Sequence, residues 1–223
     1  MIDANDQNYK FYLAKHINFS YKGNFPCGWN NYVDSLRSLS GELKILDIGC
    51  GDLRFLEFLN RNELKFSSYT GVDQINYNKS ISSSNIKIIV EDILDYIIKE
   101  KDQYNYITIF NTLYHFNSKI VLEKIIPELA SRICAGGYLA FSLWDFKQVK
   151  SLEERLELVS EQEKKYKIFT NDEVYRIAYD QTSSEFLDSL NKVLINKNFL
   201  KKLEIKTTGL NDTSNTYFLY KNI

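Results

Sequence analysis

The stretch Ile45-Leu-Asp-Ile-Gly-Cys-Gly-Asp52 joins an apolar run to a glycine-rich turn. The apolar run, residues 43–48, has the length and composition of a buried parallel strand. Glycines directly behind such a strand allow the backbone to approach a ligand closely at the carboxyl end of the strand. The stretch therefore predicts a ligand-binding turn at the edge of a parallel sheet.

Outward from this turn, short apolar runs alternate with segments whose apolar residues recur at helical spacing. The expected strands are residues 43–48, 68–72, 86–90, 106–110, 138–144, 200–207 and 216–220, and the expected helices between the first five are residues 53–59, 94–99 and 121–133. This alternation predicts βαβ units, and the turn signal Gly209-Leu-Asn-Asp212 predicts that the last two strands form a hairpin. We expect an α/β fold with a doubly wound, mostly parallel, seven-stranded sheet and a C-terminal antiparallel hairpin.

The chain of 223 residues fits a single domain, residues 1–223. Residues 1–40 are expected to form an N-terminal helical lid, residues 41–146 the cofactor-binding core, and residues 147–223 the C-terminal helices and last two strands. Within the last part, residues 147–168 predict a long charged helix and residues 185–196 another helix. Pro127 predicts an irregularity in the third core helix, and Gly136-Gly137 predict the end of that helix.

The composition limits the classes of function. Hydrophobic residues make up 44% and charged residues 26%, and the formal net charge of −1 gives no overall signature of nucleic-acid binding. Three widely spaced cysteines are too few for a zinc site or disulfide framework, so we expect no metal, free thiols and a cytoplasmic location. No signal peptide or membrane partner is expected. Seven lysines lie in the last third of the chain: Lys164, Lys165, Lys167, Lys197, Lys201, Lys202 and Lys206. We interpret them as parts of solvent-exposed faces, and a local basic patch is the alternative.

Three cofactors suit a glycine turn of this kind, and the surrounding residues discriminate between them. A nucleoside triphosphate requires Gly-x-x-x-x-Gly-Lys-Ser/Thr, which is absent. A dinucleotide requires a third glycine where this chain has Arg54. S-adenosylmethionine carries no pyrophosphate and needs no such glycine. Its ammonium and sulfonium favour an acid near the end of the strand, which Asp47 supplies.

Suitable groups also follow the next three predicted strands. Asp73 follows the second strand and can accept hydrogen bonds from both ribose hydroxyls. Asp92 follows the third strand and can accept from the adenine amine, while Ile93 offers its backbone N–H. Asn111 follows the fourth strand, where the reactive methyl group would face the substrate. The agreement of four consecutive strand ends favours S-adenosylmethionine.

These motifs resemble those of the class I S-adenosylmethionine-dependent methyltransferases. The motifs are Asp47-Ile-Gly-Cys-Gly51, Gly71-Val-Asp73, Glu91-Asp92-Ile93, residues 107–115 and Ala135-Gly-Gly-Tyr-Leu139. The resemblance implies a Rossmann-like methyltransferase that binds S-adenosyl-L-methionine through Asp47, Gly49, Cys50, Gly51, Asp73, Asp92, Ile93 and Asn111. Leu53 departs from the family, which often has a third alternating glycine there, and this puts the contacts to the methionine moiety in doubt.

A narrower resemblance concerns the methyl acceptor. Residues 19–29, 113–115 and 142–144 resemble segments of the tRNA wobble-uridine carboxymethyl methyltransferases. The chain departs from their pattern: an arginine before Pro-Trp is either missing or replaced by Lys22, Tyr114 stands for the first of two histidines, and Pro26 and Trp29 are separated. The resemblance implies a tRNA acceptor and, as in the eukaryotic relatives, a small activator subunit as a partner.

Tyr114 and His115 are the candidate catalytic residues. A carboxymethyl group is already an anion at neutral pH, so both residues would position or screen it. If the acceptor is a hydroxyl or an amine, His115 becomes a candidate general base; a hydrogen-bonded structural histidine is the alternative. The candidate substrate residues are Arg54, a fork for a carboxylate, and Trp29 and Trp144, which either stack on a base or pack in the core.

Three functions are compatible with these patterns. The first is methylation of a modified tRNA base, the second is O- or N-methylation of a small molecule, and the third is a non-catalytic Rossmann-like scaffold or activator subunit. The near-neutral charge favours the second, and the segment before the first strand favours the first. Tyr12, Phe19 and Tyr21 favour an aromatic lid over the cofactor.

Overall fold

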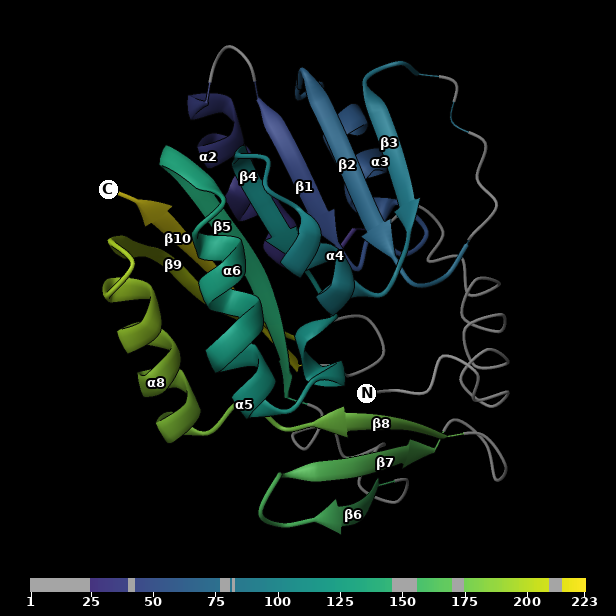
Figure 1. Cartoon of the computed structure of the whole chain (residues 1–223), viewed down its shortest axis with the longest axis vertical. Helices are drawn as coiled ribbons and strands as arrows, with labels where there is room; N and C mark the ends of the chain where they lie inside the picture. The colour runs from purple at the N-terminus through teal and green to yellow at the C-terminus, as the bar shows by residue number, and fades with distance from the viewer. Residues whose placement is uncertain are drawn as a thin grey trace.

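The computed structural model describes residues 25–39, 43–76, 81, 83–145, 156–169, 175–208 and 214–223. Its main sheet has the strand order β3-β2-β1-β4-β5-β10-β9 (Figure 1). The strands are β1 (Lys44–Ile48), β2 (Ser68–Asp73), β3 (Ile86–Val90), β4 (Tyr104–Ile109), β5 (Ile133–Asp145), β9 (Phe199–Thr208) and β10 (Ser214–Asn222). The first five pair in parallel, whereas β10 pairs antiparallel with β5 and β9. The predicted fold class is confirmed.

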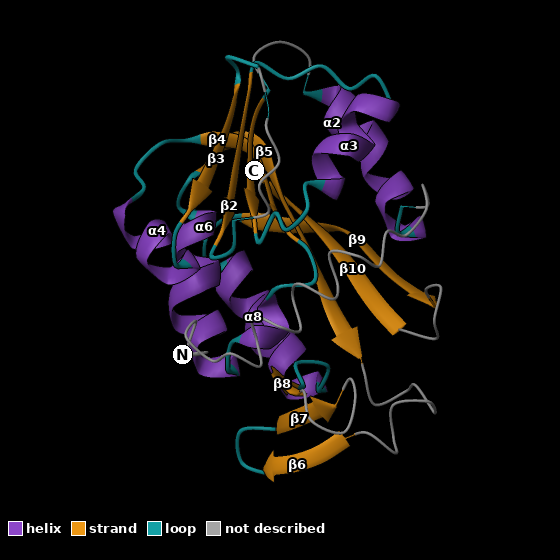
Figure 2. Ribbon diagram, turned by 90° about the vertical axis from the view of Figure 1, so that its right-hand side faces the viewer, coloured by secondary structure: helices purple, strands orange, loops and turns teal. Residues whose placement is uncertain are grey.

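Helices cover both faces of this sheet, as the side view in Figure 2 shows. One face carries η1 (Cys27–Tyr32), α2 (Val33–Ser38) and α3 (Arg54–Arg61), and the other carries α4 (Ile93–Lys99), α5 (Ser118–Ile120), η3 (Val121–Ile125), α6 (Ile126–Ala130) and α8 (Ser184–Ile195). Each face buries its own hydrophobic cluster against the strands. Among the described residues, no helix is long and apolar enough to cross a membrane.

The segment before β5 corrects the prediction of a helix ended by two glycines. The helix ends at Ala130, and β5 begins at Ile133, before the glycines. Gly136 has a φ of 78°, and a Cβ on Gly137 would lie 2.7 Å from the carbonyl oxygen of Asn105. The glycines therefore belong to β5 and allow its backbone to lie close to β4, where the pairing of the two strands is irregular. Pro127, which has no N–H to donate, follows the π-helical turn η3 at the start of α6.

A second, three-stranded antiparallel sheet lies between β5 and α8 in the chain. It contains β6 (Leu156–Ser160), β7 (Lys165–Phe169) and β8 (Tyr175–Tyr179), so the predicted charged helix over residues 147–168 is wrong. In β7 the buried Tyr166 and Ile168 alternate with partly exposed lysines, which is the period of a strand. Residues 147–155 lie outside the described residues. Figure 1 shows this sheet beyond the carboxyl ends of the parallel strands.

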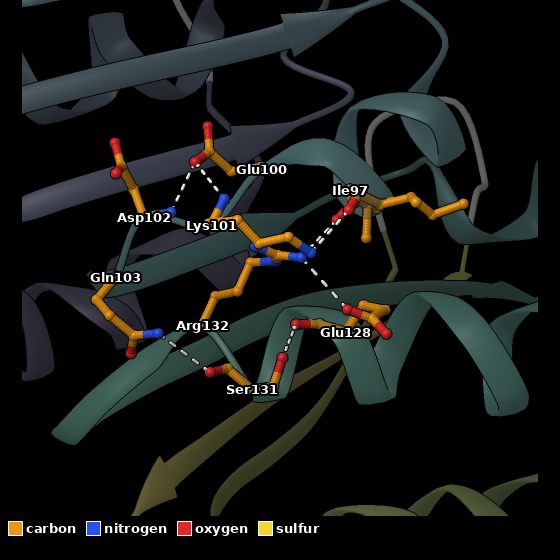
Figure 3. A network of polar contacts seen from close by, with 9 residues as sticks. Ile97, Glu100, Lys101, Asp102, Gln103, Glu128, Ser131 and Arg132 are labelled. Atoms are coloured by element: carbon orange, nitrogen blue, oxygen red, sulfur yellow. Dashed lines mark hydrogen bonds and ion pairs between the residues drawn. The ribbon is translucent and has the colours of Figure 1, made fainter.

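A polar network joins α4 and α6 at the opposite, amino-terminal edge of β4 (Figure 3). The Arg132 side chain is only 4% exposed, and its Nη2 donates to the carbonyl oxygen of Ile97 at 2.7 Å and lies 3.3 Å from a Glu128 carboxylate oxygen. The cation thus meets the negative end of the α4 helix dipole. Arg132 therefore ties the last turn of α4 to α6.

A buried carboxylate connects three central strands. Asp47 of β1 is 3% exposed and accepts hydrogen bonds from the hydroxyl groups of Tyr69 of β2 at 2.5 Å and Thr108 of β4 at 2.7 Å. Burial raises the pKa of Asp47 to about 6, although these two hydrogen bonds lower it. The Asp47 side chain is therefore an internal bridge directly below the glycine turn.

The Arg132→Ala substitution should lower the free energy of unfolding by about 2–4 kcal/mol, because it leaves the buried Ile97 carbonyl without its charged donor and opens a cavity. Urea denaturation measures the loss. Arg61→Ala, which removes an exposed ion pair with Glu57, is the control and should cost less than about 1 kcal/mol. Equal losses in the two variants would contradict the structural role of Arg132.

The stability of the Asp47→Asn variant relative to the parent should depend on pH. The folded chain holds the Asp47 proton more tightly than the unfolded chain, so the contribution of Asp47 to stability falls as the pH rises from about 4 to about 6. Across that window the variant should gain about 2–3 kcal/mol relative to the parent, measured by urea unfolding. Asp34→Asn, which changes an exposed carboxylate of α2, reports the general effect of removing one charge. A pH-independent difference for Asp47→Asn would rule out this linkage.

Candidate active site

The glycine turn after β1 is fastened to the end of β2. The backbone amides of Gly49 and Cys50 both donate to the carbonyl oxygen of Val72, at 2.8 and 3.1 Å. Gly49 and Gly51 have φ values of 71° and 51°, a region that favours glycine. A Cβ on Gly49 would also collide with the Thr112 side chain. The turn therefore requires glycine at its first position for both conformation and space.

Leu53 stands where the family often has a third glycine, and it adopts the left-handed backbone conformation that a glycine would take there. Its φ is 66° and its ψ 29°, and it forms the N-cap of α3. The side chain is 6% exposed and belongs to the same hydrophobic cluster as Phe55 and Phe110. Burial of the leucine offsets a backbone cost of about 1–2 kcal/mol. The turn thus keeps a glycine-like path while its side chain points into the core.

Asp73 connects the end of β2 to the glycine turn. One carboxylate oxygen accepts from the backbone amide of Gly51 at 2.9 Å, and the other accepts from that of Ile75 at 3.0 Å. Burial raises the pKa of Asp73, while these backbone hydrogen bonds lower it. Each oxygen retains a lone pair, so the carboxylate can still accept from a ligand hydroxyl.

Asp92 lies at the neighbouring strand end, after β3. It is exposed and forms the N-cap of α4, because one of its oxygens accepts from the backbone amides of Leu94 at 2.9 Å and Asp95 at 3.2 Å. Ile93 opens the helix and is buried. The amide of Glu91 donates to the Asp73 carbonyl at 3.0 Å. Asp73 and Asp92 therefore lie at the ends of two adjacent strands, β2 and β3.

Asn111 marks the carboxyl end of β4. Its φ is 51°, its backbone amide donates to the Ser142 hydroxyl at 2.9 Å, and that hydroxyl donates to its side-chain oxygen at 3.3 Å. Ser142 belongs to β5 and is fully buried, whereas Asn111 is exposed. The hydrogen bonds hold Asn111 at the junction of the two strands, beside the short helix η2 (Leu113–His115).

The other half of this edge, at the ends of β4 and β5, is aromatic. The Tyr114 ring lies 4.3 Å from that of His115 and 5.2 Å from that of Trp144, measured between centroids. Tyr114 and Trp144 are buried, in one cluster with Tyr166, Ile168 and Ala178 of the second sheet. Sequence patterns missed these three residues, although the alternation in β7 was a usable signal.

The three candidate substrate residues do not lie together. Trp29 is 4% exposed, and its ring centroid lies 5.3 to 5.6 Å from those of Phe55, Phe58 and Phe110, which favours the core-packing alternative. Arg54 begins α3, with its Nε 3.0 Å from a carboxylate oxygen of Asp52. Trp144 lies near the end of β5, in the cluster that contains Tyr114. Residues 1–24, which include most of the predicted lid and of the wobble-type segment, lie outside the described residues.

The arrangement along the carboxyl edge has two halves. The carboxylates of Asp73 and Asp92 lie at the ends of β2 and β3, beside the turn that follows β1, where they can bind hydroxyl groups and cationic centres. Aromatic rings and one imidazole gather at the ends of β4 and β5, where they can hold and deprotonate an acceptor. This edge of an open α/β sheet is where ligands commonly bind.

Known proteins share this architecture. A family model described as a methyltransferase domain matches residues 21–181. A protein from Listeria monocytogenes described as an S-adenosylmethionine-dependent methyltransferase is similar with a TM-score of 0.61 and 14% identity, over 87% of this chain and 99% of the other. Comparison with curated proteins gives no match.

Two further solved structures contain a ligand. The N-methyltransferase NodS from Bradyrhizobium japonicum, in complex with S-adenosyl-l-homocysteine, gives a TM-score of 0.56 at 14% identity, over 97% of this chain and 99% of the other. Magnesium protoporphyrin IX methyltransferase from Synechocystis with bound SAM gives a TM-score of 0.59 at 14% identity, over 96% of this chain and 91% of the other. At this identity the likeness shows the fold. The family model, in contrast, spans residues 21–181 of 223, and the chain therefore belongs to the methyltransferase domain family, as an S-adenosylmethionine-dependent methyltransferase of Rossmann-like fold.

Proposed function

We propose that this methyltransferase acts on a small-molecule acceptor at the carboxyl edge of the main sheet, beside η2 and the three-stranded sheet that packs against it. The observation that carries the proposal is the packing of β7 and β8 against Tyr114 and Trp144, at the ends of β4 and β5. A sheet packed over this part of the edge restricts the size of the group that reaches it. An acceptor of about one ring fits such a site better than a long polymer surface.

The residues at the other half of the edge fit S-adenosylmethionine. We propose that the turn from Gly49 to Gly51 lies against its amino-acid moiety, that Asp73 accepts from the ribose hydroxyls, and that Asp92 and Ile93 contact the adenine. Asp73 supports this role because both of its oxygens are held in place by backbone amides and retain acceptor capacity. When bound, the cofactor supplies an electrophilic methyl group on its sulfonium.

The surface charges favour a small acceptor over tRNA. Lys164 is paired with Glu161, Lys167 with Glu157, and Lys201 with Glu204. Phosphate binding relies on lysines and arginines that are available to phosphate oxygens, so lysines already paired with carboxylates support the solvated-face interpretation. A tRNA wobble uridine is the second candidate acceptor, favoured by aromatic rings of Tyr114 and Trp144 that suit a single extruded base.

His115 has a different role for each kind of acceptor. For a hydroxyl or amine, we propose that it accepts the proton released as the methyl group is transferred. For a carboxylate, which is already ionised, it positions the anion and takes no proton. The effect of removing His115 therefore distinguishes the two chemistries.

The Asp73→Ala substitution should weaken binding of S-adenosylhomocysteine about tenfold to a hundredfold, because the charged acceptor for the ribose hydroxyls is lost. Isothermal titration calorimetry measures the affinity, and thermal unfolding confirms that the variant folds. Asp102→Ala, an exposed carboxylate at the opposite edge of the sheet (Figure 3), is the control and should bind as the parent does. Unchanged affinity in Asp73→Ala would exclude Asp73 from the ribose site.

When S-adenosylmethionine labelled in its methyl group is the donor, the label should be transferred to components of a small-metabolite extract rather than to bulk tRNA. Labelled product is separated by size, and loss of label in mild base identifies a methyl ester. With a base-stable product, His115→Gln should lower the rate about a hundredfold or more. Label confined to tRNA would overturn the small-acceptor proposal in favour of the wobble-uridine candidate.

A further inference from the structure

The turn that carries Tyr114 and His115 is held by a glutamine from a distant part of the chain. Gln181 follows β8 and is 1% exposed. Its side-chain Nε2 donates to the carbonyl oxygens of Leu113 at 3.0 Å and Phe116 at 2.7 Å. These carbonyls flank the two candidate catalytic residues on either side. One buried side chain therefore clamps both ends of the turn.

The chemistry of this clamp requires an amide. Both partners are carbonyl oxygens, which only accept hydrogen bonds, so the group facing them must donate twice. The NH₂ group of a glutamine does so without charge. A deprotonated carboxylate in its place would put a third acceptor against the two carbonyls, and an apolar side chain would leave both carbonyls without a donor.

The turn is a short helix with local backbone hydrogen bonds. Helix η2 is three residues long, and its local backbone hydrogen bonds run from His115 to Thr112 at 3.1 Å and from Phe116 to Leu113 at 2.9 Å. A single helical turn of this kind is weakly stable by itself. The placement of its side chains therefore depends on contacts from outside the turn, which include the two hydrogen bonds from Gln181 and the packing of Tyr114 against Trp144 and the second sheet.

Gln181 is itself held on the second sheet. The preceding Asp180 accepts, at one carboxylate oxygen, from the backbone amide of Thr182 at 3.0 Å and from its hydroxyl at 2.6 Å. The Asp180 backbone amide donates to the carbonyl oxygen of Lys164, at the turn between β6 and β7, at 2.9 Å. The loop that presents Gln181 is thus fixed to β6–β8 before it reaches η2.

We propose that Gln181 is a positioning residue of the acceptor site, which fixes Tyr114 and His115 against the β6–β8 sheet and so sets where they meet the methyl acceptor. The proposal rests on the proposed function, since it places the acceptor at this turn. It predicts that acceptor chemistry depends on Gln181 whereas cofactor binding, at β1 to β3, does not.

Two substitutions separate shape from hydrogen bonding. Gln181→Met keeps the length of the side chain and removes both donors. Gln181→Glu keeps the shape and, when protonated, restores one O–H donor, so its effect should diminish as the pH is lowered. Gln103→Met is the matched control, because Gln103 also donates from Nε2 to a backbone carbonyl, that of Ser131 at 3.3 Å, at the opposite edge of the sheet (Figure 3).

The first measurement needs no acceptor. In ¹⁵N-labelled protein, the imidazole signal of His115 and the indole N–H signal of Trp144 are assigned by their loss in His115→Gln and Trp144→Phe. At mildly alkaline pH both signals should move in Gln181→Met and Gln181→Glu and stay in place in Gln103→Met. On acidification the Trp144 signal should return toward its parental position in Gln181→Glu alone, since the indole does not titrate.

The second measurement is functional. Affinity for S-adenosylhomocysteine should stay within about twofold of the parent in Gln181→Met, whereas methyl transfer to the small-metabolite extract should fall about tenfold to a hundredfold. Transfer by Gln181→Glu, relative to the parent at each pH, should recover as the pH is lowered.

The outcomes separate the two proposals. Unmoved His115 and Trp144 signals in Gln181→Met would overturn the positioning role, whether or not any acceptor is methylated. Loss of cofactor affinity in parallel with transfer would also overturn it, because the residue would then serve the fold as a whole. A third outcome is that the signals shift in Gln181→Met, cofactor binding stays intact, and the parent methylates neither the small-metabolite extract nor tRNA. This outcome would support the positioning role and reject the proposed acceptor.

Discussion

The carboxyl edge of the sheet depends on the hydrogen bonds that tie the glycine turn to the end of β2. The Val72 carbonyl accepts from the amides of Gly49 and Cys50, and the Asp73 carboxylate accepts from that of Gly51. Left-handed glycines have wide conformational freedom, and these bonds select one path among many. The turn then ends in Leu53, whose buried side chain joins it to the core below. Asp73, the residue proposed for the ribose, is thereby joined directly to this turn.

Sequence patterns predicted the strands of the central sheet, apart from the start of β5, because most of the local patterns there favour one interpretation. The apolar run 86–90 coincides with β3, and Asp92 caps the helix that follows it. The second sheet was missed for a physical reason. Glutamates and lysines over residues 156–169 suit the exposed face of a helix as well as that of a strand. What decides for the strand is burial of Tyr166 and Ile168 against Tyr114 and Trp144, a tertiary contact of which the short alternation in β7 is the local sign.

The candidate site, like the fold, could be predicted only in part from the sequence. Parallel order alone brings neighbouring strand ends together, so the relative positions of Asp73, Asp92 and Asn111 follow from motifs and topology. Side-chain direction does not follow from them. For Trp29 the sequence left stacking on a base and packing in the core open, and the structure shows it packed among phenylalanines. Gln181 carries no motif at all, and its importance becomes visible only once the chain has brought it to η2.

The long strand β5 has a consequence for how such an enzyme can diversify. Its thirteen residues extend from the amino edge of the sheet to the acceptor side, and the second sheet follows it in the chain. The bonds that shape the glycine turn lie on β1 and β2, whereas the second sheet reaches the rest of the protein through η2 and the end of β5. Insertions or exchanges in residues 146–180 can therefore alter the acceptor side while the hydrogen bonds of the cofactor side stay the same. In the proposed function, substrate range and cofactor use are therefore separable traits.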